Sequence, residues 1–286
     1  MQIIRRIVEM KQKIKKIKKD GKKIGIVPTM GYLHEGHISL IEKIKSKVDI
    51  IVLSIFVNPK QFGENEDLES YPRNIEKDSK IAEEAGVDFI FYPLEKEMYP
   101  NGYQTVINLT ELTKGLCGEK RPGHFKGVAT VVLKLFNIIK PDFAVFGLKD
   151  AQQVRVIEKM QEDLNLDVKI IRAEIIREID GLAKSSRNKY LNEKERKDAL
   201  VLRKSLLYAK EIIEAGETSS SIIIKKVEKY ITSNYKNINV DYFEIVDFEK
   251  LEKIEELHKI HSEILIAMAV YVGNTRLIDN MLLNKY

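Results

Sequence analysis

The sequence predicts an α/β fold: a Rossmann-like parallel sheet with helices on both faces, plus a smaller C-terminal α+β domain. Short β-branched runs alternate with helix-length amphipathic segments from residue 23 to residue 171, which is typical of a parallel sheet. The run VDIIVLSIFV at 48–57 is almost uninterrupted, as expected for a strand buried on both faces. After Arg177 the pattern changes to helices followed by closely spaced strands. We therefore predict two domains, residues 1–176 and 177–286.

The first predicted element is a helix over residues 1–19. Its apolar residues recur at steps of three and four and lysines cover the remaining surface; they are Ile3, Ile7, Met10, Ile14 and Ile17. This pattern predicts a surface helix that docks on the core. A basic amphipathic helix can also bind a membrane or RNA.

Strands and helices then alternate along the first domain. The predicted strands are residues 23–27, 48–57, 87–92, 142–146 and 168–171. The predicted helices are residues 34–47, 74–85, 128–139 and 151–164. The segment 93–125 is predicted to be mostly irregular, with a short strand at 105–109, and a long excursion of this kind is often a lid or a binding loop.

The second domain is predicted to begin with helices and to end with strands. The predicted helices are residues 192–215 and 219–234, and the predicted strands are residues 240–246, 263–272 and 275–280.

Composition excludes several classes of protein. Lys and Arg number 48 against 43 Asp and Glu, and the net charge of +5 is too small to indicate nucleic acid as the partner. The single cysteine, Cys117, excludes an internal disulfide framework and favours a reducing cytoplasm. We expect no signal peptide and no membrane span, because the amino terminus is charged and no run of 18 uncharged apolar residues occurs.

The most informative motif is PTMGYLHEGHISLI at 28–41. It follows a predicted strand, and His34 and His37 lie on one face of the first turn of a helix. Backbone N–H groups and the helix dipole favour an anion there, and two imidazole donors would stabilise a phosphate that gains charge in a transition state. Gly36 leaves room for close approach of a phosphate or an adenine ring. A metal site would need a third ligand, and the motif offers no obvious one.

Two further segments carry groups suited to phosphate. FGLKDAQQ at 146–153 follows a strand, so Lys149 is expected at the carboxyl edge of the sheet, where ligands bind in open α/β folds. Asp150 there either caps the next helix or contacts a ligand, and Gln153 can present an amide to a hydroxyl or carboxylate. In REIDGLAKSSRN at 177–188, Ser185, Ser186 and Arg187 form a run that can clamp a polyphosphate.

Two other segments contain candidate binding residues. The strand at 48–57 ends next to Asn58, which places Asn58 and Gln61 at the sheet edge, and the acidic stretch 63–69 is predicted to be mobile and solvated. In GEKRPGHFKGVATVVLKLF at 118–136, Arg121 and His124 precede an apolar helix. They either line the pocket or close a turn.

Five motifs in this order resemble the pantoate–β-alanine ligase (pantothenate synthetase) family of the nucleotidylyltransferase superfamily. They are PTMGxLHxGH, NPxQF, RPGHFxGV, G-x-K-D-x-Q-Q and SSRN. The resemblance implies that ATP and Mg²⁺ are used to join (R)-pantoate to β-alanine in pantothenate and coenzyme A biosynthesis. It also implies a pantoyl-adenylate intermediate, release of pyrophosphate and AMP, and a cytoplasmic homodimer with small-molecule partners.

The same resemblance assigns roles to residues. His37 is implied as a proton donor, with His34, Lys149 and Arg187 also catalytic, and Mg²⁺ is expected through the ATP phosphates, with no metal ligand among the residues. The implied ATP site consists of Met30, Gly31, Tyr32, Leu33, His34, Glu35, Gly36, His37, Gly147, Leu148, Lys149, Asp150, Ile176, Lys184, Ser185, Ser186 and Arg187. The implied pantoate and β-alanine site consists of Gln61, Gln153, Asn58, Pro28 and Thr29.

Two ATP-site positions are less typical of the family. Leu148 fills a slot that is commonly polar, and Lys184 stands where Met or Leu is usual. Lys184 contributes either its backbone to adenine or its side chain to the phosphates.

Two alternative functions remain. Another nucleotidylyltransferase could activate a different acid, although Gln61 and Gln153 argue against a phosphorylated substrate. An RNA-binding protein could use the lysines of residues 11–23, but no aromatic platform accompanies them.

Overall fold

The computed structural model describes residues 1–64 and 66–284, and the chain divides into two compact units. Unit 1 consists of Met1–Leu109, Arg121–Leu148 and Val156–Glu174. Unit 2 consists of Thr110–Lys120, Lys149–Arg155 and the chain from Ile175 onward. Two short segments thus group with unit 2 although they precede residue 176. The predicted domain boundary at that residue stays a prediction.

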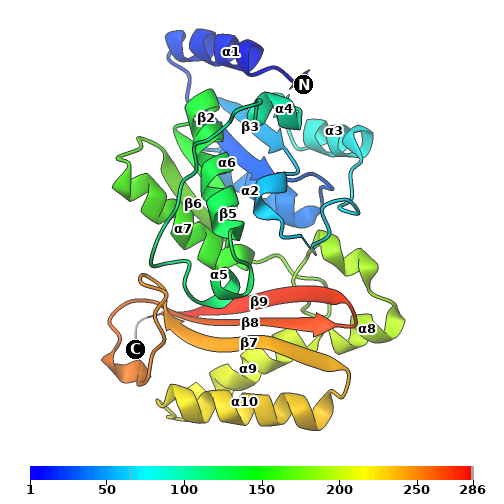
Figure 1. Ribbon diagram of the computed structural model, residues 1–286, viewed down its shortest axis with the longest axis vertical. Coiled ribbons are helices and arrows are strands. Elements are labelled where there is room, and N and C mark those ends of the chain that lie inside the picture. Colours follow the sequence, from blue (N-terminus) through cyan, green and yellow to red (C-terminus); the bar gives the residue numbers. More distant parts are fainter. Residues whose placement is uncertain (65, 285–286) are drawn as a thin grey trace. The chain divides into compact units, whose positions relative to one another are not determined.

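Unit 1 is built on a parallel sheet (Figure 1). Its strand order is β1-β4-β3-β2-β5-β6. The strands are Gln2–Ile4 (β1), Ile24–Thr29 (β2), Ile50–Ile55 (β3), Phe89–Phe91 (β4), Phe143–Gly147 (β5) and Lys169–Ala173 (β6). The prediction of a parallel sheet is confirmed.

Helices cover both faces of this sheet. On one face, α2 (Glu35–Lys45) and α3 (Ile75–Glu84) share an apolar core with the strands. On the other, α6 (His124–Ile139) packs against β2 and α1 (Ile7–Lys19) packs against α6. Gly25 in β2 allows the close approach of α2, because a Cβ there would lie 2.5 Å from Ile44 Cδ1.

The amino terminus differs from the sequence prediction. Gln2–Ile4 forms β1 and pairs with β4, so the helix begins at Ile7 rather than at residue 1. Ile4 is fully buried. Three residues are too few to show a period of two, and pairing with a distant strand decides their conformation.

The segment 93–125 is mostly irregular, as predicted, and contains α4 (Glu95–Met98) and α5 (Leu116–Lys120). The predicted strand at 105–109 is wrong, because these residues join no ladder. Instead, the backbone N–H of Ile107 donates to Thr130 Oγ1 at 2.9 Å. The Thr130 hydroxyl thus accepts the backbone hydrogen bond that the carbonyl of a neighbouring strand would accept in a sheet.

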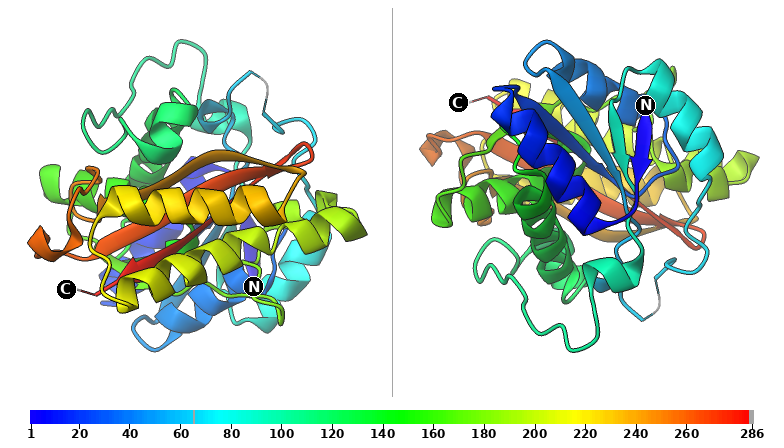
Figure 2. Two further views of the ribbon diagram at one scale, coloured as in Figure 1. Left: turned by 90° about the horizontal axis from the view of Figure 1, so that it is seen from below. Right: turned by 90° about the horizontal axis from the view of Figure 1, so that it is seen from above.

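Unit 2 contains an antiparallel sheet of β7 (Ile238–Asp247), β8 (Ile264–Val272) and β9 (Thr275–Leu283). Helices α9 (Val201–Glu214) and α10 (Ser220–Asn234) lie side by side across it and share its core (Figure 2). The predicted α+β character is confirmed.

One predicted helix of unit 2 is divided into two helices in the structure. Residues 192–215 form α8 (Glu193–Asp198) and α9, separated at residues 199–200. Asn192 and Glu195 form a capping box that starts α8, while Ala199 and Val201 are fully buried.

Helix α7 (Ala151–Asp163) contributes residues to both units.

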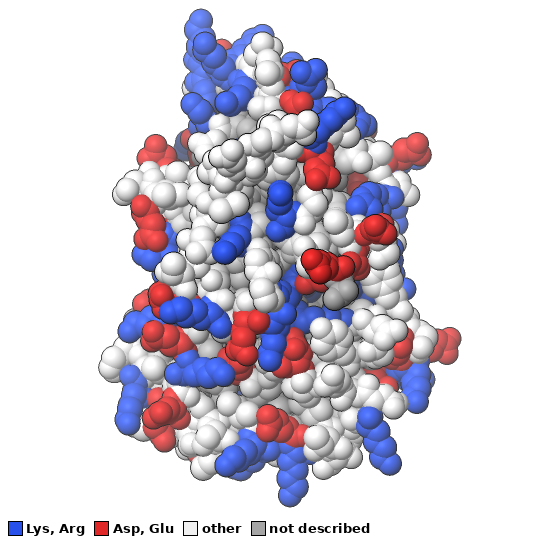
Figure 3. Space-filling model, in the orientation of Figure 1, with Lys and Arg blue, Asp and Glu red and all other residues white. Residues whose placement is uncertain are grey.

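Lysines of α1 form the basic surface that the sequence indicated, and Figure 3 shows Lys and Arg gathered there. The apolar side of the helix is buried at Met10 and Ile14. Within the described residues, none of the helices combines the length and the apolar character that crossing a bilayer requires.

Candidate active site

The motif at 28–41 forms a sharp turn between β2 and α2. Gly31 and Tyr32 have the left-handed φ values 86° and 54°. Thr29 Oγ1 accepts a hydrogen bond from the backbone N–H of Gly31 at 3.2 Å and donates to the carbonyl of Ser54 at 2.8 Å. This hydroxyl therefore closes the turn onto β3.

A carboxylate from α3 completes the turn. Asp78 is 2% exposed, and its two oxygens accept the backbone N–H groups of Tyr32 and Leu33, each at 2.8 Å. Asp78 is not among the residues predicted from the sequence. A signal was present, because Asp78 lies three residues after Ile75 and four before Ala82, on the apolar stripe of an amphipathic helix where an acid is unusual.

His34 and His37 form a reciprocal cap at the start of α2. His34 Nδ1 accepts the backbone N–H of Gly36 at 3.1 Å, and His37 Nδ1 accepts that of His34 at 3.3 Å. The ring centroids are 4.1 Å apart. Because each Nδ1 is an acceptor, the hydrogen bonds assign the proton of each neutral imidazole to Nε2. The pair thus offers two Nε2–H donors beside a helix amino terminus, which suits a phosphate.

Gly36 has a role that the sequence did not indicate. A Cβ at this position would lie 2.8 Å from Cε1 and 2.9 Å from Nδ1 of His34. Glycine therefore makes room for the His34 ring in its capping position.

Asn58 and Gln61 lie at the carboxyl end of β3, as predicted, in and beside the short helix η1 (Pro59–Gln61). Asn58 is 1% exposed; its amide nitrogen donates to Gln61 Oε1 and to the carbonyl of Gly127, both at 3.1 Å. Its oxygen accepts from the Tyr99 hydroxyl at 2.8 Å. Gln61 Nε2 in turn contacts Met30 Sδ at 3.3 Å. Asn58 thus holds Gln61 beside the turn at 28–37.

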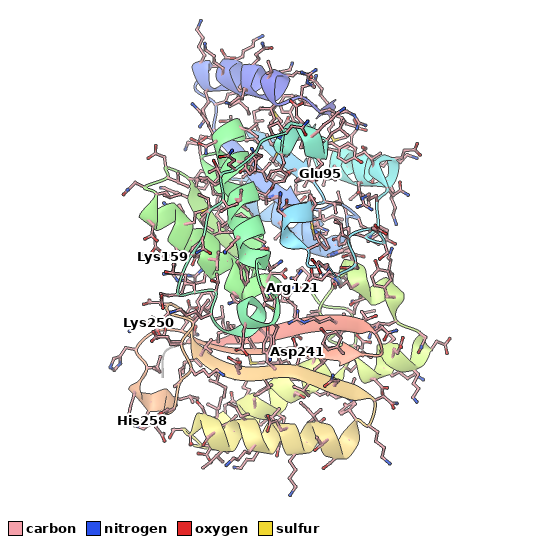
Figure 4. The ribbon with its side chains drawn as sticks, in the orientation of Figure 1. Glu95, Arg121, Lys159, Asp241, Lys250 and His258 are labelled. Carbon is pink, nitrogen blue, oxygen red and sulfur yellow. The ribbon has the colours of Figure 1, made fainter. Side chains whose placement is uncertain are left out.

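Arg121, which is labelled in Figure 4, lies just before α6, and with His124 at the first position of α6 it extends this network. His124 Nδ1 lies 2.8 Å from the carbonyl oxygen of Gln61, and His124 Nε2 lies 3.0 Å from an Arg121 nitrogen. Arg121 also donates to both carboxylate oxygens of Glu66, at 2.6 and 2.5 Å. The two residues therefore bind the backbone of Gln61 to the acidic stretch at 63–69.

The electrostatics of this pair favour an ionised Glu66. Burial alone would raise the pKa of the carboxyl, but the hydrogen bonds and positive charge of Arg121 outweigh it and hold the pKa below the ordinary value of 4.5. The Glu66 side chain is 25% exposed, so the acidic stretch is anchored at this residue rather than solvated throughout.

In unit 2, Lys149 and Asp150 belong to the short helix η2 (Leu148–Asp150), which leads from β5 into α7. The Lys149 carbonyl accepts a hydrogen bond from the Asn280 amide at 2.9 Å, and its ammonium lies 3.7 Å from Asp150. Gln153 is half-buried on the first turn of α7. Its neighbour Gln152 is buried and donates to the carbonyls of Leu112 and Gly115, which holds the segment 110–120.

The SSRN segment of unit 2 forms η3 (Ser186–Tyr190). Ser185 Oγ accepts the backbone N–H of Arg187 at 3.3 Å, and the Asn188 amide donates to the carbonyl of Ala183 at 3.1 Å. The Lys184 backbone N–H donates to the Ile176 carbonyl at 2.9 Å, while the Lys184 ammonium lies 3.3 Å from a Glu178 carboxylate oxygen. The Lys184 side chain thus has an acidic partner within its own loop.

Unit 2 contains a buried anchor that is not among the residues predicted from the sequence. Asp279 on β9 is 1% exposed and accepts two hydrogen bonds from Arg177, at 2.7 and 2.9 Å. This pair fastens the beginning of the segment 177–188 to the antiparallel sheet. A bidentate pair of this kind fixes the orientation of both side chains.

The structure brings together part of each predicted set. In unit 1, Met30, Gln61 and Asn58 form one bonded group beside the His34–His37 cap. In unit 2, Ile176 and Lys184 pair through their backbones. Across the described residues, no cluster of three or more His, Cys, Asp or Glu side chains is arranged to hold a metal ion.

Comparisons with known proteins agree on one family. The family described as pantoate-β-alanine ligase matches residues 2–282. The pantothenate synthetase of Caldicellulosiruptor saccharolyticus is 55% identical over 281 residues, which cover 98% of this chain and 99% of the relative. The pantothenate synthetase of Fervidobacterium nodosum is 54% identical over 284 residues, which cover 99% of this chain and 100% of the relative.

Solved structures give the same result. The crystal structure of pantothenate synthetase from Thermus thermophilus has a TM-score of 0.90 and 38% identity, covering 98% of this chain and 99% of its own. The pantoate-β-alanine ligase of Francisella tularensis, complexed with β-γ ATP and β-alanine, has a TM-score of 0.79 and 35% identity, covering 99% and 97%.

Proposed function

The chain belongs to the pantoate–β-alanine ligase family, and we propose that its ATP-dependent condensation of pantoate with β-alanine proceeds through a pantoyl adenylate. The observation that carries the mechanism is the His34–His37 cap at the start of α2, which offers two Nε2–H donors. Activation of a carboxylate by ATP builds negative charge on the α-phosphoryl oxygens. Donors already held in place are the groups that stabilise such charge.

The proposed reaction has two steps. A carboxylate oxygen of pantoate attacks the α-phosphorus of ATP, and the bond to pyrophosphate breaks. The amine of β-alanine then attacks the acyl carbon, loses a proton, and displaces AMP as the amide forms. We assign His37 as a proton donor and His34 as a second donor to the phosphoryl group in the first step.

ATP is proposed to enter as its Mg²⁺ complex. Mg²⁺ usually retains several waters and binds substrate phosphates, where it neutralises part of their charge. The imidazole, hydroxyl and cationic groups of the predicted site suit phosphate oxygens rather than a hard cation. They therefore fit a metal that arrives with the nucleotide.

The remaining predicted ATP-site residues divide into three proposed groups. Lys149 and Arg187 supply positive charge, and Ser185 and Ser186 supply hydroxyl donors. Lys184 is proposed to contribute its backbone, because its ammonium lies beside Glu178. The others are proposed to shape the nucleotide site, namely Met30, Gly31, Tyr32, Leu33, Glu35, Gly36, Gly147, Leu148, Asp150 and Ile176.

We propose that Gln61 and Gln153 contact pantoate, with Gln61 also bordering β-alanine. Asn58 is buried and its amide is bonded within the chain, which supports a role in holding Gln61. Thr29 similarly uses its hydroxyl to close the turn, next to Pro28. Asn58, Thr29 and Pro28 are therefore proposed to shape the acid site rather than to bind substrate through their polar atoms.

The finer biological assignments also stay proposals. The family supports a role in pantothenate and coenzyme A biosynthesis and a homodimer, and the use of ATP supports a cytoplasmic location. The mild net charge supports small-molecule substrates and no nucleic-acid partner. The absence of a tRNA shift in a low-salt binding assay would agree with this.

The decisive experiment measures AMP release with pantoate, β-alanine and MgATP, omitting each in turn. Pantoate and ATP without β-alanine should exchange labelled pyrophosphate into ATP, and this exchange should vanish when pantoate is omitted. An acyl-phosphate route that releases ADP predicts no such exchange. An enzyme that is active in the full assay but shows no exchange would therefore exclude the adenylate.

A further inference from the structure

A buried carboxylate binds the turn that precedes the histidine pair from a distant part of unit 1. Asp78 on α3 accepts the N–H groups of Tyr32 and Leu33, 46 and 45 residues earlier in the chain. A buried carboxylate is unfavourable unless hydrogen bonds compensate for its lost hydration. We propose that Asp78 is a positioning residue for the condensation reaction, fixing where His34 and His37 present their Nε2–H groups. This inference rests on the proposed function of that pair.

The turn needs an external partner because of its backbone conformation. Tyr32 adopts φ 54°, a left-handed conformation that is unfavourable for a residue with a side chain. Its N–H and that of Leu33 precede α2, so neither is satisfied within the helix. The two Asp78 oxygens accept one N–H each, which fixes the orientation of both peptide planes.

Gly31, which precedes Tyr32 in the turn, also lies close to the Asp78 carboxylate. A Cβ on Gly31 would lie 3.0 Å from Asp78 Oδ2 and 3.0 Å from Ile55 Cγ2. Gly31, Tyr32 and Leu33 are thus packed against one carboxylate. A shift of the carboxylate displaces the turn.

Displacement of the turn reaches the imidazoles through one peptide bond. Leu33 is bonded to Asp78, and His34 follows it directly with extended backbone, φ −143° and ψ 176°. The His34 N–H that donates to His37 Nδ1 belongs to the peptide joining Leu33 to His34. Asp78 therefore controls both the cap and the direction of the two Nε2–H groups. Misplacement of a catalytic donor by about 1 Å can cost about a hundredfold in rate.

The same sheet contains a matched carboxylate without this role. Asp88 Oδ2 accepts the backbone N–H of Ile51 at 2.8 Å, near the amino end of β3, opposite the edge that carries the turn. Asp88 is only partly buried and accepts one N–H, so the control Asp88→Asn removes the same charge while its amide oxygen can keep that hydrogen bond, and it does not touch the His34–His37 cap.

The test compares Asp78→Asn with Asp88→Asn in the full chain. The amide keeps the shape of Asp78 but has a single acceptor oxygen, so one of the two N–H groups loses its partner. We expect kcat to fall by at least about tenfold in Asp78→Asn, with the KM for ATP changed by less than about threefold. Asp88→Asn, whose amide oxygen can still accept the Ile51 N–H, should keep kcat within about twofold of the wild type.

A second readout does not depend on activity. Long-range ¹H–¹⁵N spectra of histidine-labelled protein report the tautomer of each ring, and the wild type should show the Nε2–H form for His34 and His37. Asp78→Asn should shift these two sets of signals while those of His124, His258 and His261 stay unchanged. The spectra remain informative even if the wild type proves to act on another acid, so the two proposals can fail separately.

Two results would overturn the inference. One is an Asp78→Asn enzyme with kcat within twofold of the wild type. The other is a loss of kcat in that variant without any change in the His34 and His37 signals, which would show that Asp78 does not act through the histidine pair. If Asp78→Asn does not fold, Gly31→Ala presses a methyl group against Asp78 Oδ2 and must change the same signals and kcat.

Discussion

The two helix starts that carry the phosphate-suited side chains resemble each other locally. His34 begins α2 and Ser185 begins η3, both from extended backbone, with φ −143° and −151°. Each uses its side chain to accept the N–H two residues further on, at 3.1 and 3.3 Å. Each start is therefore a side-chain cap that leaves cationic or imidazole groups in the first turn.

The two starts differ in how far their supporting contacts reach. The cap of α2 is reciprocated by His37 and preceded by a turn bound to Asp78, 45 residues away. The side-chain bonds of Ser185 and Asn188 reach two and five residues along the chain. Tertiary structure thus supports the cap of α2 directly, whereas the cap of η3 is local and the long-range Arg177–Asp279 pair fastens only the beginning of its segment.

The largest expected effect lies at the tertiary-supported start. His37→Ala should lower kcat by at least about a hundredfold with folding intact, because a donor positioned at developing charge contributes about 3–4 kcal/mol. Steady-state AMP release checks it, with the exposed His261 changed to Ala as the control. Near-normal turnover would remove His37 from the mechanism and make the capping geometry purely structural.

The next largest effect is expected at Gln61, which the buried Asn58 holds beside the turn of unit 1. Gln61→Ala should raise the KM for pantoate about tenfold to thirtyfold and leave the KM for ATP nearly unchanged, because a lost polar contact costs about 1–3 kcal/mol. Gln161→Ala is the matched control, since Gln161 bonds to the Leu166 carbonyl away from the predicted site. Equal losses for pantoate and ATP would place Gln61 elsewhere.

A smaller effect is expected at the locally supported start. Ser185→Ala should raise the KM for ATP by about fivefold, because loss of a side-chain cap costs about 1 kcal/mol. Ser185→Thr keeps the hydroxyl and should restore most of the affinity. A hundredfold effect with the Ala variant would contradict a purely local cap and would indicate a direct role of the hydroxyl in catalysis.

The smallest effect concerns the second long-range tether of unit 1, between Glu66 and Arg121. The folded pKa of Glu66 lies below 4.5, so the ion pair stabilises the protein above that pH and loses its effect as the pH falls through the folded pKa. Glu66→Gln should therefore lower the free energy of unfolding by about 0.5–1 kcal/mol at pH 7, given the partial exposure of the pair.

Denaturant unfolding at several pH values measures this difference. The gap between the variant and the wild type should close as the pH is lowered below about 4.5. A gap independent of pH would mean that packing, and not charge, holds the acidic stretch.

Much of unit 1 could be predicted because its signals are local. The run VDIIVLSIFV indicates β3 through its own composition, and the motif at 28–41 indicates a turn followed by a helix. The predicted strand at 105–109 failed because its apolar residues have a strand-like pattern but no neighbouring strand, and Ile107 bonds to Thr130 instead. Residues 2–4 show the opposite: their own sequence does not indicate a strand, and they form one because they pair with β4.

The candidate site divides in the same way. The sequence by itself determined the chemistry of the protein: the histidine pair, the glutamines and the SSRN run are recognisable from residue types and spacing. Only the tertiary structure decided what holds them in place. Asp78 binds the turn at Tyr32 and Leu33, Asn58 holds Gln61, and Gly36 makes room for the His34 ring. The physical reason is that buried hydrogen-bond partners are brought together across tens of residues by packing, and no local pattern encodes which groups will meet.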